Sequence, residues 1–254
     1  MRHALRTLGC LGLALALVGC RNSSLRPTTS LAESSPPYSS VPVPRTTPTP
    51  GLRHRTQAEP LARYDVAWRP AAALPDRSLP PARLATLEYE VARWVADERQ
   101  LLHPPATTRR WQYIVLHHSA SENDSLETID RFHREVRGWD GCGYHFIIGN
   151  GSYSGDGQIE VSRRWLEQKH GAHTKVPGHP EYNQFGIGIC LVGNFEQHPP
   201  SARQVQAAQA LIAYLMARYA IPPSNVSLHR VLARGRTACP GRYFPEELLL
   251  PRNR

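Results

Sequence analysis

Residues 111–120 read Trp111-Gln-Tyr-Ile-Val-Leu-His-His-Ser-Ala120, and this stretch decides the fold that the sequence predicts. Tyr113 to Leu116 are aromatic, apolar or β-branched, which indicates a buried strand. The strand ends in two adjacent histidines, His117 and His118. Because successive side chains of a strand point to opposite faces, only one of the two can face a given site.

A second group of candidate ligands lies near the end of the chain. His229 and Cys239 stand in the segment Leu228-His-Arg-Val-Leu-Ala-Arg-Gly-Arg-Thr-Ala-Cys-Pro-Gly241. Two histidines and a cysteine form a recognised ligand set for Zn²⁺, and three protein ligands leave the fourth tetrahedral position open to water. The spacing is unlike that of a zinc finger. The pattern therefore favours a catalytic zinc site, although each histidine taken alone is more often a hydrogen-bonded structural residue than a ligand.

The remainder of the chain after residue 110 alternates between strands and helices. Apolar spacing predicts a helix from Leu126 that is capped by Asp124 or Ser125 and ended by Gly138. We expect further strands at 143–148 and 186–193, a glycine-rich hairpin at 149–157 and a long amphipathic helix at 201–219. This alternation predicts an α/β fold, with a single domain built on a central mixed β-sheet flanked by helices and a zinc site in a surface cleft.

The N-terminal part of the chain predicts export and a tether. Residues 1–20 combine a cationic start, an apolar run too short to span a bilayer and the ending Leu17-Val-Gly-Cys20, which resembles a bacterial lipoprotein signal with Cys20 as the lipidated residue. An ordinary cleaved signal is the alternative. Residues 21–60 are rich in Pro, Ser and Thr, which indicates a disordered tether. We therefore expect a protein that is lipid-anchored in the bacterial cell envelope, facing the periplasm.

Residues 61–110 are expected to form an N-terminal extension that contains a helix. From Pro81 onwards the apolar residues follow helical spacing, at Leu84, Leu87, Val91, Trp94 and Val95. This helix either packs on the domain that begins at residue 111 or belongs to the tether.

The net charge of +9 does not indicate a nucleic-acid-binding protein. Residues 111–254 carry 15 lysines and arginines against 13 aspartates and glutamates, so most of the excess lies outside the expected domain. No basic stripe with interleaved aromatic residues is present in the sequence. Nothing in the sequence indicates an oligomer, so a monomer is expected.

Two cysteines remain once Cys10 and Cys20 of the signal and the candidate ligand Cys239 are set aside. Cys142 and Cys190 either form a disulfide, which an exported compartment permits, or remain as two buried free thiols.

Five blocks of sequence, taken together, resemble a known family. They are Ile114-Val-Leu-His-His-Ser-Ala120, Gly143-Tyr-His-Phe-Ile-Ile148, Gly171-Ala-His-Thr174, Tyr182-Asn183 with Gly186-Ile-Gly-Ile-Cys-Leu-Val-Gly193, and His229-Arg230 with Ala238-Cys-Pro-Gly241. In this order and spacing they are similar to the zinc-dependent N-acetylmuramoyl-L-alanine amidases of the phage lysozyme and peptidoglycan recognition protein type. The resemblance covers roughly residues 111–250.

The resemblance implies roles for individual residues. His117, His229 and Cys239 would be the zinc ligands, and His118 would face away in a structural role. Tyr144 matches the catalytic tyrosine of the family, and Thr237 stands where catalytically active recognition proteins have a threonine. The expected contacts to substrate are made by His173, Asn183 and, less directly, His145.

At Cys190 the chain departs from some amidases of this type, which carry a glutamate at that position. No general base is evident, and Asp156 and Glu160 are the carboxylates that could replace it. The function implied is hydrolysis of the amide bond between N-acetylmuramic acid and L-alanine in peptidoglycan or muropeptides. The alternatives are a non-catalytic peptidoglycan-binding module and a zinc peptidase that acts on stem peptides.

Overall fold

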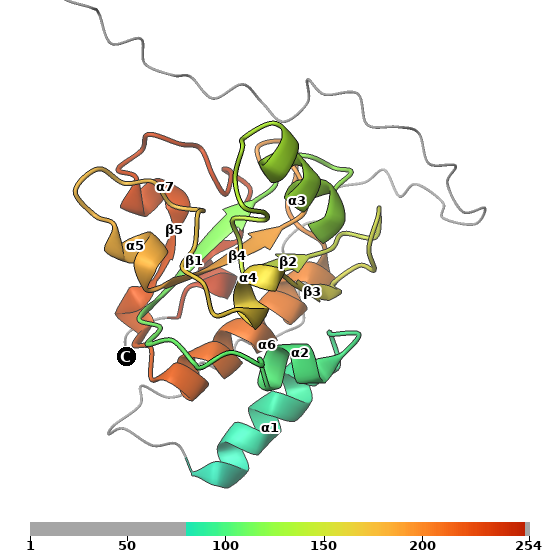
Figure 1. Ribbon diagram of the computed structural model, residues 1–254. Coiled ribbons are helices and arrows are strands. Elements are labelled where there is room, and N and C mark those ends of the chain that lie inside the picture. Colours follow the sequence, from blue (N-terminus) through green and yellow to red (C-terminus); the bar gives the residue numbers. More distant parts are fainter. Residues whose placement is uncertain (1–79, 252–254) are drawn as a thin grey trace, which may run out of the picture. The chain divides into compact units, whose positions relative to one another are not determined.

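The computed structural model describes residues 80–251, which fold around a five-stranded sheet (Figure 1). Its strands stand in the order β3-β2-β4-β1-β5. Their bounds are β1 Tyr113–His118, β2 Phe146–Ile148, β3 Ile159–Val161, β4 Gly186–Leu191 and β5 Val226–Leu228. β1 runs parallel to β4 and β5, β2 runs parallel to β4, and β3 is antiparallel to β2. The predicted mixed sheet is therefore confirmed.

The helices lie on both sides of this sheet. In chain order they are α1 Pro81–Ala92, α2 Glu98–Leu102, α3 Leu126–Glu135, α4 Arg163–Leu166, α5 Glu181–Gln184, α6 Ala202–Tyr219, α7 His229–Leu232 and α8 Glu246–Leu249. Ser125 caps α3 and Ser201 caps α6, each in a capping box that satisfies free backbone N–H groups of the first turn. The two long helices predicted after residue 110 thus begin where the sequence indicates.

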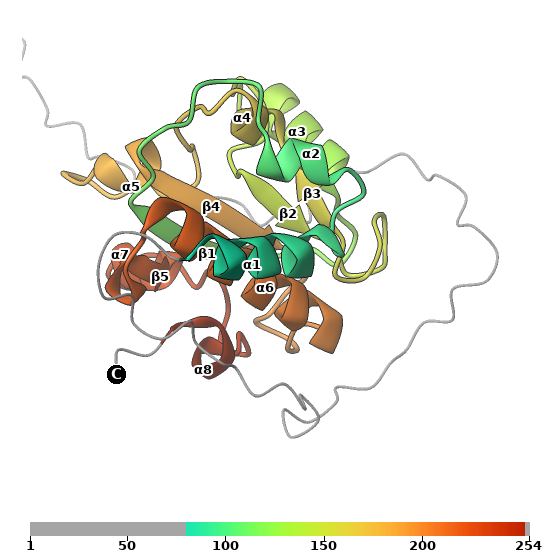
Figure 2. The same ribbon diagram turned by 90° about the horizontal axis from the view of Figure 1, so that it is seen from below.

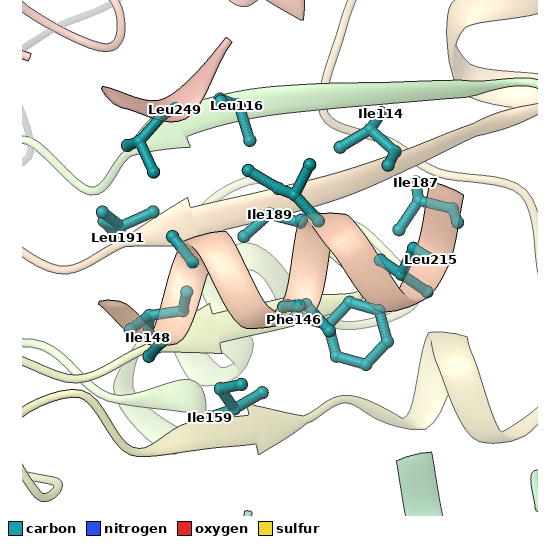
Figure 3. Close-up of a cluster of buried hydrophobic side chains, with 14 of the residues drawn as sticks. Ile114, Leu116, Phe146, Ile148, Ile159, Ile187, Ile189, Leu191, Leu215 and Leu249 are labelled. Atoms are coloured by element: carbon teal, nitrogen blue, oxygen red, sulfur yellow. The ribbon is translucent and has the colours of Figure 1, made fainter. Parts of the chain in front are cut away.

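One face of the sheet forms the main hydrophobic core. Figure 3 shows apolar side chains of the central strands facing α6, and they include Ile114, Leu116, Ile187, Ile189 and Leu191. These side chains are fully buried. They occupy alternate positions along β1 and β4, as the period of a strand requires.

The opposite face of the sheet carries smaller and more polar side chains. His117 of β1 stands beside Cys190 of β4 in the parallel register, and Val115 stands beside Gly188. Cys190 packs with Ile147 and with Ile129 of α3 in a second, smaller apolar cluster. Because β4 presents Gly186, Gly188 and Cys190 on this face, room is left above the sheet for side chains from loops.

The helix predicted from Pro81 is present and ends at Ala92, before the last apolar residues of the pattern. Figure 2 shows it beside α6. Val91 and Leu101, in α1 and α2, are fully buried in the main core, and Val95 forms a β-bridge with Ile159 at the edge of the sheet. Residues 81–102 therefore pack against the domain.

Two further expectations concern local structure. Of the strand expected over 143–148, only Phe146–Ile148 is formed. Gly143, Tyr144 and His145 lie before the residues that pair with β3. The glycine-rich stretch 149–157 does join the antiparallel pair β2 and β3, as predicted. Cys142 and Cys190 are buried free thiols.

The predicted signal, the lipidated Cys20 and the tether all lie outside the described residues. Within residues 80–251, no helix has both the length and the apolar character needed to cross a membrane.

Candidate metal centre

Three predicted ligands meet at the carboxyl ends of two neighbouring strands. His117 lies near the end of β1, and His229 directly follows β5, the parallel neighbour of β1. Cys239 comes from the loop after α7. One ligand atom from each residue can be chosen so that all lie within 4.8 Å of one another. Cys239 Sγ lies 3.6 Å from His117 Nδ1, and the rings of His117 and His229 have centroids 4.7 Å apart.

The loop that carries Cys239 is held by backbone hydrogen bonds. Arg230 N–H donates to Cys239 O at 2.7 Å, and Cys239 N–H donates to Thr237 Oγ1 at 3.2 Å. His118 N–H at the end of β1 donates to Cys239 Sγ at 3.4 Å. The thiol is thus tied both to the start of α7 and to the strand that bears His117.

Burial sets the charge state of these groups. It lowers the pKa of His117 well below its ordinary value and that of His229 to about 4, so both imidazoles are neutral at neutral pH. It raises the pKa of the Cys239 thiol to about 12. Two neutral imidazoles and a thiol that is deprotonated when a cation binds are a donor set that Zn²⁺ prefers. The residues present therefore fit that ion.

His118 points to the other face of the sheet, as strand alternation predicts. It is buried, its Nδ1 accepts a hydrogen bond from Phe195 N–H at 3.3 Å, and its ring lies beside that of Phe195. This is the structural role expected for the second histidine of the pair.

Tyr144 lies beside the three ligands. Its half-buried ring has its centroid 5.0 Å from that of His117. Thr237 is in the ligand loop, where its Oγ1 accepts the Cys239 N–H. The structure thus brings both predicted catalytic residues into the neighbourhood of the ligand set.

His173 and Asn183, expected to contact substrate, are joined to each other and to the metal centre. His173 is buried, and its Nδ1 lies 3.1 Å from His117 Nε2. Asn183 Oδ1 accepts the backbone N–H groups of His173 and Thr174 at 3.0 and 2.9 Å. His173 therefore contacts a candidate ligand directly, a relation that the sequence analysis did not predict.

His145 does not lie where a substrate could reach it. The ring is fully buried, its Nδ1 accepts from Gly188 N–H at 3.0 Å, and its Nε2 lies 3.0 Å from Lys169 O. It packs edge-on against Trp111 at a centroid distance of 4.7 Å. The expected substrate contact is therefore replaced by a structural role, because both ring nitrogens are used inside the protein.

The two carboxylates considered as a general base are engaged elsewhere. Glu160 accepts the Leu126 N–H at 3.0 Å and so caps the start of α3. Asp156 accepts a hydrogen bond from Ser201 Oγ at the start of α6. Both contacts hold helices in place and leave the base unassigned.

Comparison with known proteins gives one match at the level of a family. The family model described as N-acetylmuramoyl-L-alanine amidase matches residues 107–242, which is more than half of the chain. This segment contains every residue of the metal centre described above.

Individual relatives agree with this match. Peptidoglycan-recognition protein LB of Drosophila melanogaster is 34% identical over 144 residues, which cover 53% of this chain and 56% of the relative. An N-acetylmuramoyl-L-alanine amidase of Sus scrofa is 31% identical over 119 residues, covering 46% of this chain and 18% of that protein. The chain thus spans less than two thirds of the length of either relative.

Among solved structures, the N-acetylmuramoyl-L-alanine amidase LysC from Clostridium intestinale URNW is 35% identical, with a TM-score of 0.46 and coverage of 55% of this chain and 83% of that chain. On the family match to residues 107–242, the chain belongs to the N-acetylmuramoyl-L-alanine amidase family.

Proposed function

We propose that this protein is a zinc-dependent N-acetylmuramoyl-L-alanine amidase that hydrolyses the bond between N-acetylmuramic acid and the L-alanine of the stem peptide. The observation that carries the proposal is the meeting of His117, His229 and Cys239 within 4.8 Å, with Tyr144 beside them. Family membership supplies the substrate class, and the ligand set supplies the reaction type.

His117, His229 and Cys239 would hold the ion. When bound, Zn²⁺ acts as a Lewis acid that activates water and polarises the amide carbonyl. The two histidines contribute no charge and the cysteine contributes one negative charge, so the loaded centre keeps a net charge of about +1. That charge favours binding of an anionic transition state over the neutral substrate.

The remaining site residues would act on the substrate itself. The Tyr144 ring lies beside that of His117, and we assign its hydroxyl, a hydrogen-bond donor, to the developing oxyanion. Thr237 is the second candidate donor, since it lies in the loop that presents Cys239. Asn183, partly exposed beside the loop that carries His173, remains our candidate for contact with the stem peptide.

A non-catalytic peptidoglycan-binding module is the second candidate function. The fly relative at 34% identity is named a recognition protein, which favours binding as part of the activity. The presence of Cys239 in the ligand set favours the enzyme, because a binding module does not need a site that can hold a metal. A zinc peptidase would use the same centre, and its reaction products would distinguish it from an amidase.

The experiment is a paired measurement of metal content and peptidoglycan digestion. Purified wild-type protein is compared with Cys239→Ala and with Cys142→Ala, which removes a buried thiol that is not among the candidate ligands. We expect about one zinc per chain and full digestion for the wild type and Cys142→Ala, with loss of zinc and at least ~100-fold lower activity for Cys239→Ala. Full zinc content and full activity in Cys239→Ala would overturn the proposal.

We also propose, from the sequence, that the chain is exported and lipidated at Cys20. Metabolic labelling with a fatty-acid probe in a bacterial host should label the wild type and leave Cys20→Ser unlabelled, with Cys10→Ser as the matched control. Equal labelling of Cys20→Ser and the wild type would refute lipidation at Cys20.

A further inference from the structure

A chain of hydrogen bonds connects the metal centre to the backbone of β4 through His173. His173 Nε2 lies 3.2 Å from the carbonyl oxygen of Gly186, the first residue of β4. On the other side of the ring, His173 Nδ1 lies 3.1 Å from His117 Nε2 and 2.8 Å from Thr174 Oγ1. His117 Nδ1 in turn faces Cys239 Sγ at 3.6 Å.

The direction of these bonds follows from the carbonyl at one end. A carbonyl oxygen only accepts, so His173 Nε2 must carry the proton that it shares with Gly186. The ring is buried, and none of its hydrogen-bond partners in the described part of the chain is a carboxylate, so its neutral form is favoured. Its Nδ1 is then an acceptor, and it faces both His117 Nε2 at 3.1 Å and the Thr174 hydroxyl at 2.8 Å. The Thr174 oxygen also lies 3.4 Å from His117 Nε2 and has a single hydrogen to donate. A proton on His117 Nε2 is therefore the arrangement in which neither ring nitrogen is left facing another lone pair.

The consequence for His117 is a single tautomer. With its proton on Nε2, the neutral His117 ring has its lone pair on Nδ1, the atom that faces Cys239 Sγ. A neutral imidazole nitrogen with a free lone pair is what a metal ligand must offer.

The surroundings of His173 hold its ring in place. A Cβ atom added at Gly171 or at Gly188 would overlap the ring, so the imidazole occupies space that two glycines leave open. Asn183 Oδ1 accepts the backbone N–H groups of both His173 and Thr174. The ring is therefore packed closely against the backbone at both glycines and is also held through its own backbone.

We propose that His173 is a positioning residue that holds His117 in the tautomer and orientation that present Nδ1 to zinc. The inference rests on the proposed zinc centre, and it replaces the substrate contact expected for His173 from the sequence. His173 acts through His117 and does not itself touch the ion.

The first test uses wild-type protein without metal. Two-bond ¹⁵N–¹H correlation spectra of protein labelled in its histidines report which nitrogen carries the proton, with signals assigned by comparison with His117→Asn and His173→Asn. We expect both His117 and His173 to be protonated on Nε2. A proton on His117 Nδ1 would overturn the inference whether or not zinc binds.

The second test measures zinc affinity by competition with a chromophoric chelator. His173→Leu should bind zinc about 10- to 100-fold more weakly than the wild type, the usual loss when a partner of a metal ligand is removed. His173→Asn, whose amide oxygen can stand in for Nδ1 as an acceptor, should recover part of that loss. The matched control is Gln209→Leu, which removes a buried hydrogen-bonding side chain of α6 on the opposite face of the sheet from His117 and should stay within about 3-fold of the wild type.

The two proposals fail in different ways. If the wild type does not bind zinc, the proposed function is wrong, while the tautomer spectra still decide whether His173 orients His117. If the wild type binds zinc and His173→Leu binds it equally well, the zinc centre stands and the positioning role of His173 is wrong. Equal weakening by Gln209→Leu and His173→Leu would also count against the positioning role, because it would reflect a general loss of packing.

Discussion

Tyr144 is the single residue whose hydroxyl should matter most to turnover without affecting the metal. It lies beside His117 and is not among the candidate ligands. Tyr144→Phe keeps the ring and its packing and removes only the donor, so we expect kcat to fall about 10²- to 10³-fold, the cost of losing one oxyanion donor. Zinc content and KM should stay close to those of the wild type.

Tyr153→Phe is the matched control, since it removes the hydroxyl of an exposed tyrosine in the hairpin between β2 and β3. Steady-state kinetics on a defined muropeptide would report both variants. An unchanged kcat in Tyr144→Phe would remove Tyr144 from the mechanism.

At this scale the sequence indicated the residues that meet in the candidate metal centre better than the residues that support them. His117, His229 and Cys239 are recognisable because their chemistry and their motifs are distinctive. The roles of His173 and His145 depend on which atoms surround each ring, and those atoms come from distant segments such as Gly186 and Trp111. The alternation of glycine with isoleucine in Gly186-Ile-Gly-Ile was the available signal that one face of β4 had to leave room for another side chain.

At the scale of elements, α1 and α2 act as part of the domain. Leu101 of α2 is fully buried in the main core, and its carbonyl accepts the Trp165 indole N–H at 3.1 Å. Leu101→Ala should therefore lower the free energy of unfolding by about 2–5 kcal/mol, as expected for truncating a buried leucine. Urea denaturation followed by tryptophan fluorescence would measure the change.

The comparison is Tyr89→Ala in α1, where the side chain is 72% exposed and the expected change is within about 0.5 kcal/mol. If Leu101→Ala unfolds at the wild-type midpoint, α2 does not contribute to the core.

Helices with an apolar stripe and a clear start signal were predictable as elements: α1 begins at Pro81, and α3 and α6 begin after a capping serine. The shortening of β2 was not predictable, because Gly143 to His145 have the composition of a strand, whereas Gly143 N–H donates to His133 Nδ1 of α3 and not to a neighbouring strand. The sequence also left open whether α1 packs on the domain or belongs to the tether, because helical periodicity indicates an apolar face without indicating what that face contacts.

At the scale of the whole molecule, the described domain holds five buried histidines. Burial lowers the pKa of each of them, to about 4 for His118 and His133 and to about 3 for His173. The five are His117, His118, His133, His145 and His173.

An unfolded histidine titrates near pH ~6.5, so below that value the unfolded chain binds protons that the folded chain excludes. The stabilisation from these neutral rings is complete above about pH 6.5 and is lost as the pH falls toward the folded-state pKa values, with a slope of up to about 1.4 kcal/mol per pH unit for each ring. Asp124 and Glu160 act in the opposite direction, because burial raises the pKa of Asp124 to about 6 and that of Glu160 above its ordinary value. These two carboxylates are outnumbered by the five buried histidines together with His229, whose pKa is also lowered, to about 4, so a net loss of stability in acid remains.

We therefore expect the urea midpoint of the metal-free protein to fall steadily between about pH 6.5 and about pH 4.5, with acid unfolding above about pH 4. A midpoint that stays constant over this range would show that the buried rings are not neutral in the folded protein.

The most direct measurement is mass spectrometry of a defined muropeptide incubated with the purified protein, with and without a zinc chelator. We predict release of the intact stem peptide with a free L-alanine amino group, together with the unchanged glycan fragment, and no release when zinc is removed. Cleavage inside the stem peptide would reassign the protein as a peptidase. Binding of the muropeptide without any product, in protein loaded with zinc, would contradict the proposed catalysis and leave a recognition module.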